Sequence, residues 1–401
     1  MRKVFLIFFE VILILPVLSG CWNQKEMPDL AFIMALGVDM GEDKKYDVSF
    51  QIVNPGNVAA GQSGGGQGLP IVIYTSSGDT LTEAARNATK KVSRRLYYAH
   101  TNLVVISEEV AKEGLLDILD ALDRDPEFRT TTELLVARGS TARELVSTLT
   151  VLDKIPVSKI TKQLKSTEAM LGENIKVNID DLISGIVSTG IEPILNGYTV
   201  IGEQENSGKA DILQSSRPSA IIAADGLAIF KDGKLVGWIE NDKARGVIYI
   251  MDKVKSTNID VNFKGKKNAI SMSQIRSKSK VSVQFKNGRP IINIAIEDEG
   301  WISEANTAIN LTDPTVIEKI DKLIEKEIKK QVTASIKDAQ KLKTDIFGFG
   351  ERVHRANPKL WKKIEGNWNE QFADLEVNVK VDSYIRREGV RTNPFWLDLN
   401  K

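Results

Sequence analysis

The chain has 401 residues, of which 42% are hydrophobic and 27% are charged, as in ordinary folded proteins, so disorder is not expected along most of its length. Its 54 basic and 53 acidic residues give a net charge of +1. This balance argues against nucleic acid as a main partner, because binding to phosphates requires a basic surface. The length suits two or three domains of roughly 100–200 residues each.

Residues 1–20 have the pattern of a signal peptide that ends in a lipobox. Arg2 and Lys3 make a basic start, residues 4–17 are mostly apolar, and the segment Leu18-Ser19-Gly20-Cys21 follows. A cysteine is required at the end of this motif because its thiolate can carry a diacylglyceryl thioether. The sequence therefore predicts that the signal peptide is removed and that Cys21 is the lipid attachment point.

An ordinary secretory signal that happens to end near a cysteine is the alternative. Glu10 interrupts the apolar run, which counts more against a transmembrane helix than against a signal peptide, because neither uninterrupted stretch could span a bilayer. No later segment has roughly 18 consecutive apolar residues, so we expect the mature body to lie outside the cytoplasmic membrane. Since Cys21 is the only cysteine, the packed core must stabilise the body without a disulfide.

The first predicted elements form a hairpin followed by a glycine-rich segment. Residues 30–39 are predicted to form a buried strand, and the alternation at 46–52 predicts a half-exposed one, with a turn at 41–45 between them. Residues 54–70 contain six glycines and have no periodicity. They lack the Gly-Lys-Ser/Thr ending of a phosphate-binding P-loop, so a flexible surface loop is the favoured interpretation.

From residue 69 to residue 150, predicted strands alternate with predicted helices. Thr80 with Glu83 and Thr141 with Glu144 are capping boxes that open helices. The strands are expected at 71–75, 103–106 and 133–137, and the apolar faces of the first two helices at Leu81, Ala84, Ala85, Ala88 and Val92, and at Val110, Leu115, Ile118, Leu119 and Leu122. Three such units imply a layered sheet with helices packed on it. No Gly-x-Gly-x-x-Gly stands at the first turn, so a dinucleotide site has no support.

The middle of the chain contains the predicted domain boundary. A helix is expected over 152–171 despite Pro156, and the stretch 202–218 is polar and rich in Ser, Gln and Glu. We therefore divide the chain into the signal peptide (1–20), an N-terminal domain (21–205) and a C-terminal domain (218–397).

The second half is predicted to be α+β, with an antiparallel sheet and a long helix. Asp232-Gly233 suits a tight turn between strands at 220–230 and 235–239, and Asn287-Gly288 suits one between 281–285 and 292–296. Asp313-Pro314 is a helix start, and an apolar stripe continues to about residue 343. Its charged face is compatible with a membrane-surface helix, but a stripe packed on the core is favoured. A closing strand is expected at 375–381. The whole chain is thus α+β, with a mixed sheet and strand–helix repeats in its N-terminal region.

We find no residues that form a catalytic or metal-binding pattern. His100 and His354 are far apart and lack metal-ligand spacing to another ligand, so structural roles are expected. The acid groups Asp180-Asp181 and 297–299 are interpreted as solvated turn residues rather than calcium or acid–base groups. Gly-x-Ser-x-Gly does not occur. The prediction is therefore no enzyme, no cofactor and no metal.

An aromatic segment near the C-terminus allows two interpretations. Gly348 and Gly350 suggest a tight turn that presents Phe349, with Trp361 and Trp368 nearby in sequence. Such aromatics occur in interface hot spots. We favour a satellite core that seals the long helix against the final strand.

Four ordered segments resemble the Ger(x)C family, the C subunits of spore nutrient-germinant receptors. The lipobox continues into Trp22-Asn23, where aspartate is common in the family at position 23, and then into Leu30–Asp39. The second segment begins at Gly78–Glu83, continues through Arg94-Arg95-Leu96 and His100, and ends at Val104–Ser107. The third consists of Gly226–Lys231, Val236-Gly237-Trp238 and Arg245-Gly246. The fourth is Asp345–Gly350, followed by Pro358, Trp361 and Trp368. The glycine-rich insertion near Gly64 departs from the family pattern.

The resemblance implies a lipoprotein on the outer face of the spore inner membrane in an endospore-forming bacterium. It implies partners as well, namely a membrane-embedded A subunit and a transporter-like B subunit, and a membrane contact through acylated Cys21. Two other classes remain open: a lipoprotein solute-binding subunit that holds the nutrient itself, and a cell-wall hydrolase. The first usually has two similar α/β lobes around a cleft, and the second needs a catalytic set that we do not find.

Overall fold

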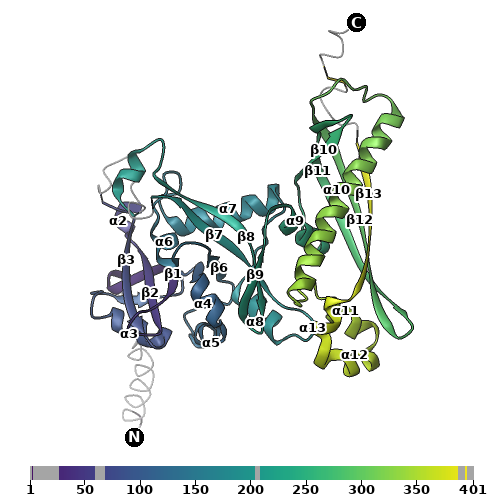
Figure 1. Ribbon diagram of the computed structural model, residues 1–401. Helices are drawn as coiled ribbons and strands as arrows, with labels where there is room; N and C mark the ends of the chain where they lie inside the picture. Colours follow the sequence, from purple (N-terminus) through teal and green to yellow (C-terminus); the bar gives the residue numbers. More distant parts are fainter. Residues whose placement is uncertain (1, 3–26, 59–67, 204–207, 387–392, 395–401) are drawn as a thin grey trace.

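The structure is a computed structural model that describes residues 2, 27–58, 68–203, 208–386 and 393–394. Two sheets lie beside each other, each with its own helices (Figure 1). The α+β class predicted from the sequence is confirmed. Cys21 and most of the glycine-rich segment lie outside the described residues.

The first sheet has nine described strands, in the order β3-β2-β1-β5-β6-β7-β8-β9, with β4 also paired to β1. The neighbours β1, β5, β6 and β7 are parallel, whereas the flanking pairs are antiparallel. The sheet is therefore mixed, as predicted. The strands are β1 (Leu30–Met40), β2 (Tyr46–Val53), β3 (Ile71–Gly78), β4 (Arg95–Tyr97), β5 (Leu103–Ser107), β6 (Glu133–Ala137), β7 (Ile194–Gly202), β8 (Ala220–Lys231) and β9 (Lys234–Ile239).

Helices cover both faces of this sheet, which explains its apolar central strands. Val104 and Ile106 of β5 pack in one core with α3, α4, α5 and α8, and Leu103 and Val105 pack in a second core with α6 and α7. The helices are α2 (Pro55–Val58), α3 (Leu81–Ala88), α4 (Glu108–Glu113), α5 (Leu116–Arg124), α6 (Ala142–Ser147), α7 (Pro156–Met170) and α8 (Ile179–Val187).

The second sheet has the order β10-β11-β12-β13, and α10 packs along it (Figure 1). Ile320, Ile324, Ile328, Val332 and Ile336 of α10 are buried in the core, which confirms a core-packed helix. The elements of this half are β10 (Asn258–Phe263), β11 (Lys266–Lys286), β12 (Arg289–Ala305), β13 (Glu376–Ile385), α9 (Asn241–Ile250), α10 (Pro314–Lys341), α11 (Phe349–Ala356), α12 (Pro358–Ile364) and α13 (Trp368–Ala373).

Two strand assignments differ from the sequence prediction in their pairing. The hairpin β8–β9, assigned to the second half, extends the first sheet instead, because β8 pairs with β7. The sheet therefore continues past the polar stretch at 202–218. The strand β13 pairs parallel to β12, so the second sheet is not wholly antiparallel. A helical crossover, α10 to α13, separates these two strands in sequence, and such a connection returns the chain in the same direction.

Several elements predicted from the sequence differ in the structure, for reasons of packing or of backbone conformation. The strand β2 is almost fully buried rather than half exposed, with Phe50 at 1% exposure, because helices cover both faces of the sheet. The expected helix through Leu122 is split into α4 and α5 at Gly114, whose φ is +136°. The helix opened by Thr80 ends at Ala88, before Val92. The expected helix over 152–171 begins at Pro156, as the first-turn preference of proline explains.

Candidate functional site

The predicted histidines lie apart and pack against aromatic rings. His100 makes edge contacts with Phe32 and Tyr97, at centroid distances of 5.4 and 5.8 Å. His354 stacks on Trp361 at 5.6 Å. Both side chains therefore have structural contacts, and the structure does not bring them together.

The predicted acid groups are also separate. Asp181 completes a capping box with Asn178 at the start of α8, so it has a local structural role. Asp298 contradicts the prediction of a solvated turn residue, because it lies inside β12 and is fully buried. Its burial raises the pKa well above the usual aspartate range, which favours the neutral carboxylic acid. Among the described residues, no group of three or more His, Cys, Asp or Glu side chains could hold a metal ion.

The aromatic segment near the C-terminus forms core, as favoured from the sequence. Phe349 is fully buried, and Trp361 and Trp368 are exposed by only 1% and 4%. Phe349 stacks on Phe347 at 5.1 Å and packs near Phe372 at 6.2 Å. These rings seal the lower end of the second half, where α11 to α13 gather (Figure 1), and they are not available as an interface hot spot.

Asp345 organises this aromatic core from its centre. Its carboxylate accepts hydrogen bonds from the backbone N–H groups of Phe349 (3.2 Å) and Gly350 (2.8 Å), and from the Trp368 Nε1–H (2.9 Å). A fourth comes from the Phe347 N–H at 3.1 Å. Burial raises the pKa of Asp345 to about 6, although each of these donors lowers it. The carboxylate is thus ionised at neutral pH and holds the start of α11, where backbone N–H groups lack helical partners.

The same turn contacts the first half of the molecule. The Glu192 N–H donates to the Asp345 carbonyl at 2.8 Å, and the Glu351 N–H donates to the Gly190 carbonyl at 3.2 Å. A Cβ on Gly190 would lie 2.8 Å from the Gly350 Cα, so only glycine allows the two backbones to approach this closely. Residues 190–192, which precede β7, therefore dock directly on the Asp345 turn.

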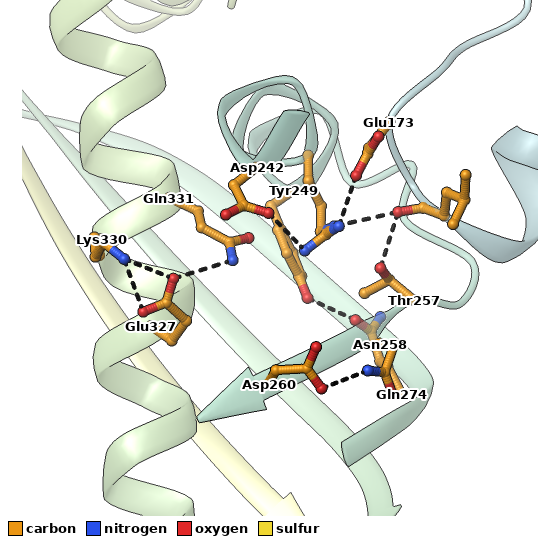
Figure 2. Close-up of polar contacts among 12 residues, drawn as sticks. Glu173, Asp242, Tyr249, Thr257, Asn258, Asp260, Gln274, Glu327, Lys330 and Gln331 are labelled. Atoms are coloured by element: carbon orange, nitrogen blue, oxygen red, sulfur yellow. Dashed lines mark hydrogen bonds and ion pairs between the residues drawn. The ribbon is translucent and has the colours of Figure 1, made fainter. Parts of the chain in front are cut away.

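A second contact joins the halves at Arg245 of α9. The Arg245 side chain pairs with Glu173 at 2.6 Å and donates to the Leu171 carbonyl at 3.2 Å, and both partners follow α7 of the first half. Thr257 donates to the same carbonyl at 2.9 Å. Figure 2 shows Glu173 and Thr257 approaching this contact from different segments. Arg245 is 9% exposed, so a paired carboxylate is required to offset the cost of burying its charge.

Helix α9, which carries Arg245, also makes close contacts inside the second half. The Tyr249 hydroxyl donates to the Gln274 Oε1 at 2.6 Å, which joins α9 to β11 (Figure 2). A Cβ on Gly246 would lie 2.6 Å from the Ser335 Oγ, so α9 and α10 cross at close range there. We call the Asp345 turn with residues 190–192, together with the Arg245 contact, the junction.

The junction fixes the two halves relative to each other. Ile194, Leu227, Ile229 and Ile239 of the first sheet belong to the same hydrophobic core as α9, α10 and the aromatic rings. This shared core joins two described halves that differ in topology. Sequence reasoning singled out Arg245 and Asp345 through the family resemblance, but it missed Glu173 and Gly190. A buried arginine requires an acidic partner, yet nothing in the sequence indicates which one.

Two family models match the chain in sequence order. The model described as the spore germination protein N-terminal domain matches residues 23–200, and the one described as spore germination B3/GerAC like, C-terminal, matches residues 225–389. The chain belongs to this family of spore germination proteins. The resemblance predicted from the sequence is thereby confirmed.

Relatives of the family match over nearly the whole chain. Spore germination protein KC of Bacillus subtilis is 42% identical, over 94% of this chain and 94% of its own length. Spore germination protein B3 of Bacillus subtilis is 25% identical, over 94% and 96%. The crystal structure of the GerBC protein superposes with a TM-score of 0.56 at 19% identity, covering 87% of this chain and 96% of that one, which shows a shared fold.

The described residues also include no helix with both the length and the apolar character needed to cross a membrane.

Proposed function

We propose that this chain is a lipid-anchored, non-enzymatic C subunit of a spore germinant receptor. In this proposal, the diacylglyceryl group on Cys21 anchors the body to the outer face of the spore inner membrane. The body then works through protein–protein contacts with the membrane-embedded A and B subunits during nutrient-triggered germination.

The match to spore germination proteins over 94% of the chain is the observation that carries this proposal. The lipobox supports the anchor, because Cys21 precedes the described body by only a few residues. Six residue-to-residue steps separate Cys21 from Met27, and they span at most about 20 Å. Two or more acyl chains on the cysteine would therefore hold the start of β1 close to the bilayer.

The architecture supports a subunit that transmits contacts rather than one that closes around a nutrient. A solute-binding lipoprotein usually has two similar lobes that move about a cleft. Here the halves differ in topology, and a continuous core and the buried Arg245 and Asp345 contacts join them. Saturable nutrient binding to the isolated chain would favour the solute-binding alternative.

Co-purification from spore membranes tests the proposal. The protein, tagged at its C-terminus, is solubilised with mild detergent and its partners are identified by mass spectrometry. We expect the cognate A and B subunits to elute with it, and deletion of the gene to abolish the response to particular nutrients while other nutrients still act. Recovery without these subunits, together with an unchanged nutrient response in the deletion strain, would contradict it.

A further inference from the structure

A stretch of 24 residues, 84–107, contains no acidic side chain. The same stretch carries five cations, all exposed at the surface: Arg86, Lys90, Lys91, Arg94 and Arg95. The whole chain has a net charge of only +1, so this segment is a local basic excess on an otherwise balanced molecule. Such an excess indicates an anionic partner.

Topology places these cations at the end of the first sheet where the described chain begins. The connection 89–94 leads from α3 into β4, and β4 runs parallel to β1, with Leu30 opposite Arg95. Parallel strands begin at the same edge of a sheet, so the start of β1 and the basic connection lie together. We call this surface, formed by residues 86–95 and the start of β1, the amino-end edge. Figure 1 shows α3 at the lower end of the first sheet.

Within the described residues, most of these charges have no acidic partner. Arg95 pairs with Glu127 at 2.6 Å, but Lys90 donates to the Asn87 amide oxygen and Lys91 to the Thr75 carbonyl. No described carboxylate forms an ion pair with Arg86 or Arg94. The edge therefore presents four uncompensated cations, Arg86, Lys90, Lys91 and Arg94.

A groove of about 650 Å³ opens beside these cations, between α3 and the loop 125–128. Its wall includes the partly exposed apolar side chains of Leu81, Ala85 and Phe128. Arg86, Arg94 and Arg95 line it as well. Tyr98, which stacks on Phe128 at 5.1 Å, also lines it, and its buried hydroxyl has no hydrogen-bond partner. Asp125 and Glu127 line the groove too, and Glu127 is neutralised by Arg95. The groove is thus amphipathic, with arginines beside an apolar surface.

The predicted anchor decides which surface faces the bilayer, so this step rests on the proposed function. The lipidated Cys21 lies at most about 20 Å from Met27, which stands just before β1. The opposite end of β1, an 11-residue strand, is roughly 35 Å further away. The amino-end edge is therefore the part of the described body held nearest to the membrane.

We propose that the amino-end edge binds anionic phospholipid in the membrane that carries the anchor. Arg86, Lys90, Lys91 and Arg94 contact the phosphates, and the apolar wall of the groove packs against the glycerol region of a headgroup. The contact orients the body on the bilayer, which attachment at a single residue cannot do alone.

Vesicle binding of the mature chain tests this proposal without the anchor. Every buried hydrophobic residue in the described part of the chain lies at or after Leu30, so a chain of residues 22–401 keeps all of that core. We expect it to bind vesicles of equal parts phosphatidylglycerol and phosphatidylcholine, and to bind pure phosphatidylcholine vesicles much more weakly. Binding should fall as salt is raised towards 0.5 M, because the Debye length then shortens to on the order of a few ångströms and the attraction between exposed charges is screened.

Charge-neutral variants locate the contact. Arg86→Gln, Lys90→Gln, Lys91→Gln and Arg94→Gln, combined, should lower the partition coefficient by about fivefold for each cation removed. A matched control removes the same charge from the exposed face of α10, through Lys319→Gln, Lys326→Gln, Lys329→Gln and Lys337→Gln. Equal binding of the two quadruple variants, or equal binding of the wild-type chain to both kinds of vesicle, would overturn the proposal.

A probe on the lipidated full-length protein gives an independent measurement. Acylation consumes the single native thiol, so Ser93→Cys introduces a unique site for a fluorophore on the edge, and Ser282→Cys introduces one on the β11 strand. On phosphatidylglycerol vesicles with headgroup quenchers, we expect quenching at position 93 and not at 282. If the protein carries an acylated Cys21 and the two positions are quenched equally, or position 93 is not quenched, the contact at the edge is refuted and the anchor is not. A chain without any acyl group refutes the anchor instead, and the mature chain then still reports on the edge.

Discussion

The junction and the amino-end edge use charged side chains in opposite ways. At the junction, Asp345 is 1% exposed and accepts four hydrogen bonds, and Arg245 is 9% exposed and bonds to three groups. At the edge, Arg86 and Arg94 are exposed and form no ion pair with any described carboxylate. The satisfied, buried charges stabilise the fold, whereas the exposed, unpaired ones are free to contact an external partner. Substitutions should therefore cost folding free energy at the junction and binding at the edge.

Asp345→Ala should have the largest effect on stability. It leaves three backbone N–H groups and the Trp368 indole N–H buried without an acceptor. We expect a loss of about 3–5 kcal/mol in the free energy of unfolding, measured by urea denaturation. Asp345→Asn, which keeps one acceptor oxygen, should lose less. A loss below about 1 kcal/mol for the alanine variant would show that the turn does not depend on this carboxylate.

Gly190→Ala should be the next most damaging change. The added Cβ would lie 2.7 Å from the Gly350 carbonyl carbon, and the residue has a φ of +83°. We expect a loss of about 2–4 kcal/mol from strain and overpacking. Gly139→Ala is the matched control, because its φ of +62° is also positive but no atom lies within 4 Å of its Cβ. The control should lose about 1 kcal/mol in the free energy of unfolding. Equal losses for the two variants would mean that the backbones at Gly190 and Gly350 can move apart without cost.

A double-mutant cycle isolates the Arg245–Glu173 pair. Arg245→Met and Glu173→Gln, alone and combined, should show a coupling energy of about 1–2 kcal/mol, because the side chains are only 11% and 27% exposed. The Arg355–Glu351 pair on α11, exposed by 68% and 41%, is the control and should couple by less than about 0.5 kcal/mol. If the coupling energy of Arg245–Glu173 is no larger than that of Arg355–Glu351, the first pair does not help to join the two halves.

The junction should also give stability a modest dependence on pH. Burial raises the pKa of Glu192 from 4.5 to about 7, next to Asp345 and Asp232. The folded chain then binds a proton that the unfolded chain releases at lower pH, so stability from this group falls as pH rises from about 4.5 to 7. Glu192 is only partly buried, so we discount the effect of this shift for solvent screening. The pKa of Asp345, raised from 3.8 to about 6, gives a fall of the same sign. Urea denaturation at several pH values should therefore show a fall with rising pH that is smaller by about 1 kcal/mol in Glu192→Gln than in the wild type. A variant with the same pH profile as the wild type would assign the dependence to other groups.

Local elements followed from short sequence patterns. Asp232-Gly233 and Asn287-Gly288 form the predicted turns, with positive φ at each residue, because these residue types tolerate that conformation. Asp313 caps α10 as expected, through a 2.9 Å hydrogen bond from the Thr315 N–H. The similar turn at Lys264-Gly265, between β10 and β11, was missed because lysine is not a typical residue for this position.

Long-range features did not follow from the sequence. Alternation predicts that β13 is a strand, but it carries no information on strand direction, and so the parallel pairing with β12 was missed. The hydrophobic pattern of β8 fits either sheet equally. Asp298 was read as a solvated acid because polarity alone does not indicate burial. Glu173 pairs with Arg245, and Gly190 packs against Gly350. These partners are far away in sequence, so the sequence alone does not identify them.

Intact-mass spectrometry of the protein purified from spore membranes of its native host tests the central claim most directly. The account predicts a chain that begins at Cys21 and carries a diacylglyceryl group on that residue. A chain with its signal peptide retained, or one that begins at another residue and carries no acyl group, would contradict it.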